Sequence, residues 1–433
     1  MSTASATRVQ FTRALRSRSF ALMWIGQSIS SLGNGAFSTA LAWQVVVLTH
    51  SATLMGIILI AQVLPSLVFL LVGGVAADRL PRRMLLFWSD AGRGVVVLLI
   101  ALLSWLHLLQ TWHLIVLALI FGIVGAFFGP AFRAIPPQLV LLEDLPSANS
   151  LTELTGQVGT LVGPLLGAVL VAISSPASAF GFDGLTFVAS ALSLFFIRIP
   201  LHSASTQKLL AAKEEDTEDM SVQPVSKGIR GMIADVREGL SYVATSTWLK
   251  ATIIIPAFGN AIFGGALAIA FPRLVHDVYG TGVWLVGACA TADALGFIGA
   301  TVFTGQVHLR KRGILAFSGS ILSCLALIMF GLPFPHSIIA GVAIVASVCS
   351  GFGIGVLQMI WVTLLHQLVP NDKLGRVGSI DLLGSLGLLP IGFAVIGILT
   401  DKIGPALIFV VGGSICLVLN CIPLFLRDIR ELE

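Results

Sequence analysis

The chain carries little charge for its length. Only 11% of its 433 residues are Asp, Glu, Lys or Arg, and 56% are hydrophobic, whereas a soluble domain has about 25% charged residues. This shortage excludes an ordinary soluble protein. Helices of about 20 apolar residues, each crossing a bilayer, are the structures that such a composition favours.

Several kinds of chemistry lack their usual sequence signatures. The five cysteines show no CxxC spacing, so neither a disulfide framework nor a zinc site is indicated. No GxxxxGKS/T occurs, which excludes a P-loop nucleotide site. The eight histidines form no HExxH and no paired acidic cluster is obvious, so we expect no enzyme and no cofactor. The net charge of +4 is spread over short loops, which argues against nucleic-acid binding.

Long uncharged runs divide the chain into helical hairpins. Most of these runs, such as 19–77 and 313–371, are too long for a single spanning helix. We therefore predict an all-α membrane protein with twelve transmembrane helices in two pseudo-symmetric bundles of six. Their expected positions are about 20–48, 54–77, 84–106, 112–132, 151–173, 178–199, 249–271, 283–305, 313–332, 337–360, 377–399 and 404–426.

The cations predict the orientation of these helices. They gather in the even-to-odd connections, for example at Arg310, Lys311 and Arg312, so the positive-inside rule places both termini in the cytoplasm. Only Arg273 and Lys402 are expected outside.

The domain boundaries follow from composition. The acidic segment after Pro200 cannot bury a core, and its later part, 229–243, has the apolar spacing of an amphipathic surface helix. We predict a cytoplasmic tail at 1–19, a six-helix bundle at 20–199, a cytoplasmic linker with an amphipathic helix at 200–248, a second six-helix bundle at 249–426 and a cytoplasmic tail at 427–433.

One acid and three arginines lie close together in the stretch GGVAADRLPRR, residues 73–83. Two bundles joined by a linker are typical of secondary transporters, whose substrate site lies between the halves. There, Gly73 and Gly74 would allow close helix packing, and Asp78 could accept hydrogen bonds from the N-terminus of another helix. A basic loop that only sets topology is the alternative.

This stretch resembles the loop between helices 2 and 3 of the major facilitator superfamily, G-x-x-x-D-R-x-G-R-R/K. Pro81 replaces the second glycine. The resemblance implies a conformational gate, in which Asp78 holds the cytoplasmic side closed against the start of helix 11 near Gly378. The matching gate residues are Gly74, Asp78, Arg79, Arg82 and Arg83.

A second pattern lies in helix 5, where glycines recur every four residues. Gly159, Gly163 and Gly167 share one face and form a groove for a neighbouring helix, and Pro164 frees a carbonyl that can bend the helix. Tight packing alone is the alternative. The run resembles the antiporter motif of the same superfamily, which implies export, and other segments such as 128–140 resemble its enterobactin- and macrolide-exporter branch.

Ionisable side chains within the predicted helices are functional candidates by default. Asp293, near the middle of helix 8, is our first candidate for a carboxyl that takes up a proton on one side and releases it on the other; a structural hydrogen bond is the alternative. Asp183, roughly 8 Å inside helix 6, either receives a cation or proton or is stabilised by the helix dipole.

Three further polar residues are candidates for lining a central cavity. Gln27 and Asn34 lie seven residues apart on one face of helix 1, where they line the cavity or bond to other helices. Arg93 either pairs with Asp90, three residues earlier, or contacts a substrate.

These patterns together favour a multi-pass exporter of the bacterial plasma (inner) membrane. We expect it to exchange protons for an amphipathic drug, antibiotic or siderophore-like compound as its two halves rock. Its partners would be this small molecule, protons and the lipid bilayer, without nucleic acid or nucleotide, and we expect a monomer. A proton-coupled importer or facilitator and a nontransporting scaffold or sensor stay open as alternatives.

Overall fold

The computed structural model describes residues 12–197, 229–307 and 310–432, and every regular element in these ranges is helical. Ten helical segments in these ranges are long and apolar enough to cross a membrane. The predicted all-α membrane fold is therefore confirmed. Two further segments, α1 and the pair α2 and α3, pack with these ten, an arrangement consistent with twelve spans.

The first bundle, called the N-half, extends to residue 197. Its long first helix is capped by Ser17, whose hydroxyl accepts a hydrogen bond from the Phe20 N–H. The elements are η1 (Arg13–Arg16), α1 (Arg18–Thr49), α2 (Ala52–Val68), α3 (Leu70–Arg79), α4 (Arg82–Trp105), α5 (Thr111–Gly125), α6 (Phe128–Ala134), α7 (Pro136–Leu139), η2 (Leu142–Asp144), α8 (Leu145–Ile173) and α9 (Pro176–Phe196).

The second bundle, called the C-half, follows a helix that lies where the amphipathic helix is expected. That helix, α11 (Ile229–Thr245), packs against α17, and Glu238 forms an ion pair with Arg376 at 2.7 Å. The other elements are α12 (Thr247–Gly265), η3 (Ala266–Ala270), α13 (Phe271–Arg273), η4 (Leu274–Val278), α14 (Trp284–Gln306), α15 (Arg312–Gly331), α16 (His336–Leu368), α17 (Asn371–Gly387), α18 (Leu389–Ile403), α19 (Pro405–Cys421), η5 (Ile422–Phe425) and α20 (Arg427–Arg430).

Some predicted helices are longer or more broken than expected. Helix 5 begins at Leu145 rather than near 151, because Pro146 fits the first helical turn, where no N–H partner is needed. Helix 2 is divided between α2 and α3 after Pro65, which cannot donate to the preceding turn. Helix 7 contains two π-helical turns, η3 and η4.

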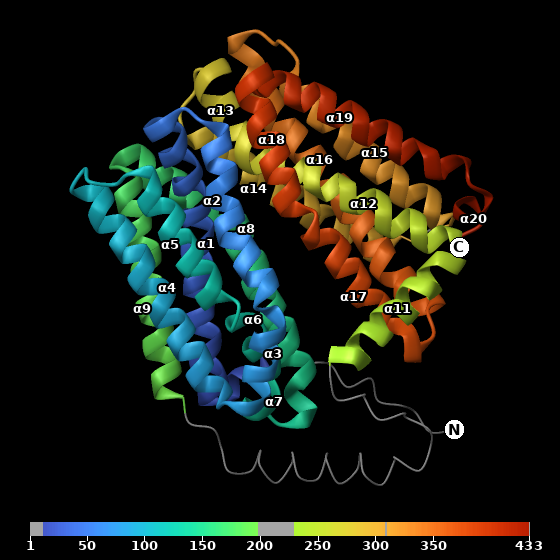
Figure 1. The fold of residues 1–433 in the computed structure, drawn as a ribbon, viewed down its shortest axis with the longest axis horizontal. Coiled ribbons are helices and arrows are strands. Elements are labelled where there is room, and N and C mark those ends of the chain that lie inside the picture. The colour runs from blue at the N-terminus through green and yellow to red at the C-terminus, as the bar shows by residue number, and fades with distance from the viewer. Residues whose placement is uncertain (1–11, 198–228, 308–309, 433) are drawn as a thin grey trace.

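The two halves meet at one end of the molecule and diverge at the other (Figure 1). At the closed end, α2 packs against α18, and the apolar core of the N-half continues into Ile269, Val283 and Phe393 of the C-half. At the opposite end, called the linker end, α3 and α17 face a gap between the bundles. The two halves are therefore in contact at the first end, and their ribbons lie apart at the linker end.

Candidate functional site

A cavity of about 760 Å³ lies between the two halves. The N-half contributes polar groups and glycines from α1 and α8, and the C-half contributes larger apolar side chains. The apolar lining side chains are Leu267, Phe271, Val286, Phe297 and Phe330, and the polar ones include Ser31, Asn34, Gln157, Thr160, Ser347 and Ser350. Such a surface suits a ligand that is mostly apolar and has a few hydrogen-bonding groups.

Among the described residues, Asp293 is the one charged residue in the lining of this cavity. It lies on α14, where its side chain is half-buried and its backbone packs closely against α16. A Cβ on Gly351 of α16 would lie 1.8 Å from the Asp293 carbonyl oxygen, so only glycine allows the two helices to lie this close. The predicted position of Asp293 near the middle of its helix thus corresponds to a carboxyl facing the space between the halves.

The glycines of α8 pack directly against α1. A Cβ on Gly163 would lie 2.7 Å from the Gly35 Cα, and one on Gly167 would lie 2.6 Å from the Ala36 Cα. Gly159 likewise faces Ser31. The groove predicted from the four-residue spacing is present, and α1 occupies it.

The same stretch of α8 also contacts the C-half. A Cβ on Gly287 of α14 would lie 2.7 Å from the Pro164 carbonyl oxygen, and the Thr291 hydroxyl donates a 2.7 Å hydrogen bond to the Leu161 carbonyl. Thr291 is two residues before Asp293. The motif on α8 therefore lies at the crossing of the two halves, and its contacts on α14 lie within two helical turns of Asp293.

A buried polar cluster lies inside the N-half. Asp90 forms the predicted ion pair with Arg93, and both side chains are almost completely buried. The Gln27 amide donates to Asp90 Oδ2 at 2.9 Å, and the Ser190 hydroxyl donates to the same oxygen at 2.6 Å. The Arg93 guanidinium also lies 4.3 Å from the ring centre of Phe128, so this charge is stabilised by a carboxylate and by an aromatic face.

The three predicted cavity-lining residues are distributed differently. Asn34 lines the central cavity and also a second cavity of about 520 Å³ in the N-half, which Gln27 lines as well. Arg93 is in the lining of neither of these two cavities. Gln27 thus lines a cavity and donates a hydrogen bond to the buried Asp90. Arg93 contacts that carboxylate and lies away from the cavity surface.

Asp183 is deeply buried where α9 packs on α1. Its Oδ1 lies 3.4 Å from the Thr186 hydroxyl, and its Oδ2 has no hydrogen-bond partner among the described residues. A Cβ on Gly33 of α1 would lie only 2.4 Å from Oδ1. Since α9 begins at Pro176, Asp183 is beyond the first turn in which a helix dipole favours an acid.

The arginines of the motif at 73–83 hold helix ends together at the linker end. Arg82 donates to the Ala134 carbonyl at 2.7 Å, and Arg83 donates to the Leu194 carbonyl at 2.9 Å. The side chain of Asp78 lies outside the described residues, and Arg79 is exposed. A Cβ on Gly73 would lie 2.6 Å from the Ala126 carbonyl oxygen, so Gly73 packs closely within its own half, as predicted. A Cβ on Gly74 or on Gly378 would meet nothing within 4 Å, so these two glycines make no such contact here.

A carboxylate that the sequence analysis did not single out joins the halves at the closed end. Asp401, at the end of α18, accepts hydrogen bonds from the Ala52 N–H and the Thr53 N–H, both at 2.9 Å, and from the Ser51 hydroxyl at 3.0 Å. These groups form the N-terminus of α2, where helix N–H groups favour an anion. Arg273 forms an ion pair with the same carboxylate.

The sequence of residues 23–387 matches the family model of the Major Facilitator Superfamily. The chain belongs to this superfamily. It is 24% identical to the multidrug efflux pump Tap of Mycolicibacterium fortuitum (93% of this chain, 94% of Tap). It is 22% identical to macrolide efflux protein A of Streptococcus pyogenes (96% and 97%) and 26% identical to the enterobactin exporter EntS of Shigella boydii (83% and 80%). These relatives confirm the predicted branch.

The fold agrees with this membership. The crystal structure of the nucleoside transporter NupG aligns with a TM-score of 0.68 at 10% identity, covering 96% of this chain and 100% of that one. The chain is therefore a multi-pass membrane transporter of this superfamily with efflux proteins among its relatives.

Proposed function

We propose that the protein exports an amphipathic small molecule across the plasma membrane in exchange for protons. The observation that carries this proposal is the lone carboxylate of Asp293 in a largely apolar cavity between two halves that are open at one end only. Both termini would be cytoplasmic, which makes the linker end the inner side, and the structure would represent the inward-open state of a monomer.

The cavity chemistry defines the class of substrate. Its volume admits a drug-sized molecule, and its apolar wall from the C-half would contact rings or alkyl groups. Hydroxyl and amide groups of the N-half would bind the polar end. Because Asp293 is the single charged group that the described residues contribute to this lining, a cationic or neutral lipophilic compound fits better than an anion.

The same carboxylate gives a simple basis for exchange. A buried carboxylate is costly unless a cation or a proton neutralises it. A substrate bound from the inner side would displace a proton from Asp293, and protonation from the outer side would release the substrate. Since α14 crosses the glycine-rich stretch of α8 next to Asp293, a change of charge there would reach the contact between the halves.

Two carboxylates at opposite ends would stabilise the two states. Asp401 at the end of helix 11 binds the N-terminus of helix 2 in this state. By the family resemblance, Asp78 at the end of helix 2 would bind the N-terminus of helix 11 when the inner side is closed. The arrangement is symmetric, and each contact would break when the other forms.

Purified protein in liposomes loaded with a pH-sensitive dye tests this proposal. We expect lipophilic cations added to the inner side to cause proton movement and to be transported, and both should be lost in Asp293→Asn. The matched control is Asp381→Asn, because Asp381 is also in a spanning helix but accepts a hydrogen bond from Trp361 and is not in the lining of the central cavity.

Three results would argue against the proposal. Drug movement without proton movement would exclude antiport, and proton-driven uptake of the drug from the outer side would indicate an importer. Equal loss of activity in Asp381→Asn would show that any carboxyl change in these helices impairs the protein, and would remove the special role of Asp293.

A further inference from the structure

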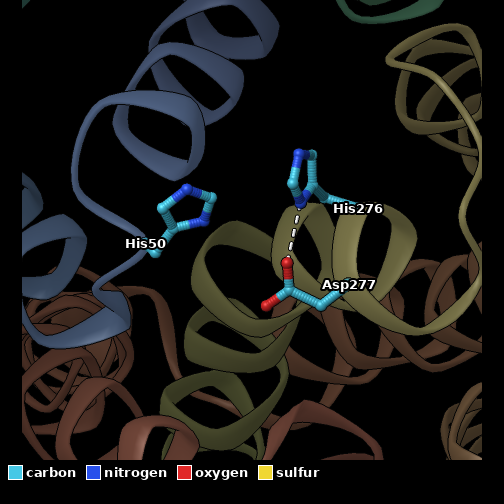
Figure 2. Close-up of side chains that lie close together, drawn as sticks. All are labelled: His50, His276 and Asp277. Atoms are coloured by element: carbon cyan, nitrogen blue, oxygen red, sulfur yellow. Dashed lines mark hydrogen bonds and ion pairs between the residues drawn. The ribbon is translucent and has the colours of Figure 1, made fainter.

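Two histidines from opposite halves meet at the closed end of the molecule. His50 follows the last residue of α1 in the N-half, and His276 belongs to η4 of the C-half. Their ring centres are 5.6 Å apart, and Asp277 lies next to them (Figure 2). One ligand atom from each of the three side chains lies within 4.8 Å of the other two.

We propose that His50, His276 and Asp277 form a binding site for a divalent transition-metal ion such as Zn²⁺, which holds this end of the transporter closed. Two imidazoles and one carboxylate are a common set of zinc ligands, and water fills the fourth position. Mg²⁺ and Ca²⁺ prefer all-oxygen sites and would bind poorly. The sequence spacing gives no sign of this site, because 226 positions separate the histidines.

The local geometry holds two of the three ligands in place. The His276 ring lies edge-on to Trp43 of α1, with centres 5.5 Å apart. Its Nδ1 and Asp277 Oδ1 are 2.7 Å apart (Figure 2), so a metal ion that replaces the shared proton must separate these two atoms slightly. Arg273 donates to the other Asp277 oxygen at 3.0 Å, and so fixes the carboxylate from behind.

To complete the site, His50 must move closer and the His276–Asp277 pair must open slightly. Two ligand atoms on one tetrahedral Zn²⁺ lie about 3.3 Å apart, given bonds of about 2.0–2.2 Å. The His50 side chain is exposed, so its rotation can shorten the remaining separation, and solvent has access to the ion. The nearby charges also allow a cation: Arg273 contributes one positive charge, whereas Asp277 and Asp401, both bound to it, contribute two negative charges.

Metal binding would be coupled to conformation because the ligands belong to different halves. An ion held by all three residues binds only while this end is closed, and it therefore shifts the population toward the state seen here. In a transporter that must open this end in each cycle, the ion acts as an inhibitor.

Calorimetric titration of the purified, tag-free protein with ZnCl₂ tests the site without any transport measurement. We expect one ion per chain with a micromolar dissociation constant, at least tenfold weaker binding in His50→Ala and in His276→Ala, and no binding of Mg²⁺. His336→Ala is the matched control, because His336 is an exposed histidine at the first residue of α16. Binding that is absent, or unchanged in both cluster variants, would overturn the proposal.

A distance measurement tests the conformational consequence. Spin labels on Leu80→Cys and Leu368→Cys, exposed positions of the two halves at the linker end, should report a larger open population with Zn²⁺ than without it. The shift should vanish in His50→Ala. Zn²⁺ binding without any change in these distances would refute the coupling. Because neither readout requires a substrate, failure of this proposal and failure of the export proposal are distinguishable.

Discussion

The N-half buries one arginine, Arg93, together with the two acids Asp90 and Asp183. Arg93 pairs with Asp90, and Asp183, whose Oδ2 has no hydrogen-bond partner among the described residues, is buried in the same bundle. Removing one member of a buried ion pair leaves an uncompensated charge, which typically costs about 3–5 kcal/mol. Replacing both members removes that penalty, so the pair should show strong non-additivity.

We therefore expect Arg93→Met to lower the thermal unfolding midpoint of the detergent-purified protein more than the double variant Asp90→Asn/Arg93→Met does. The midpoint can be followed by intrinsic tryptophan fluorescence. Gln27 keeps Asp90 as its acceptor in Arg93→Met, whereas in the double variant it must bond to the new amide oxygen, so this bond does not favour the double variant. If the decreases in the midpoint for Arg93→Met and for Asp90→Asn add up to the decrease for the double variant, the pair has no net coupling.

Helix packing in this protein depends on close backbone contact. Gly163 of α8 lies against Gly35 of α1, and both helices border the central cavity. Gly156, two turns earlier in α8, has open space where its Cβ would be. The two glycines provide a matched pair for testing whether the stripe is a packing surface.

We expect Gly163→Ala to destabilise the protein by about 1–3 kcal/mol, the usual range for overpacking, and Gly156→Ala to leave stability unchanged or to raise it slightly through better helix propensity. Unfolding midpoints of both variants in the same detergent would measure this difference. A similar decrease in both would mean that the loss of glycine itself, rather than contact with α1, is responsible.

Elements were more predictable than contacts. Runs without charge and the cations between them predicted the helices and the two halves, because the bilayer requires long apolar segments. The four-residue glycine spacing predicted the groove that α1 fills. The breaks at η3 and η4 have no strong local signal, and the roles of Asp401 and His50 depend on residues more than 200 positions away, which no periodicity reveals.

At the scale of the whole molecule, one end is held by polar contacts and the other is open. Asp401 accepts three hydrogen bonds from the start of α2 and pairs with Arg273. Asp401→Asn removes the charge but keeps the shape. Since a hydrogen bond to a charged group contributes about 1.5–3 kcal/mol, and 1.4 kcal/mol is a tenfold change, the balance of states should shift about tenfold or more.

Spin labels on Leu80→Cys and Leu368→Cys, in a background without the five native cysteines, would measure that shift. We expect Asp401→Asn to increase the fraction of molecules with a short distance between the labels at the linker end. Weaker contact at one end allows the halves to close at the other. Asp428→Asn is the control, since Asp428 is an exposed acid on α20 in the C-half. If Asp401→Asn leaves the distances as they are in the natural protein, closure of this end depends on the apolar contacts between α2 and α18, and the carboxylate has no role in the balance.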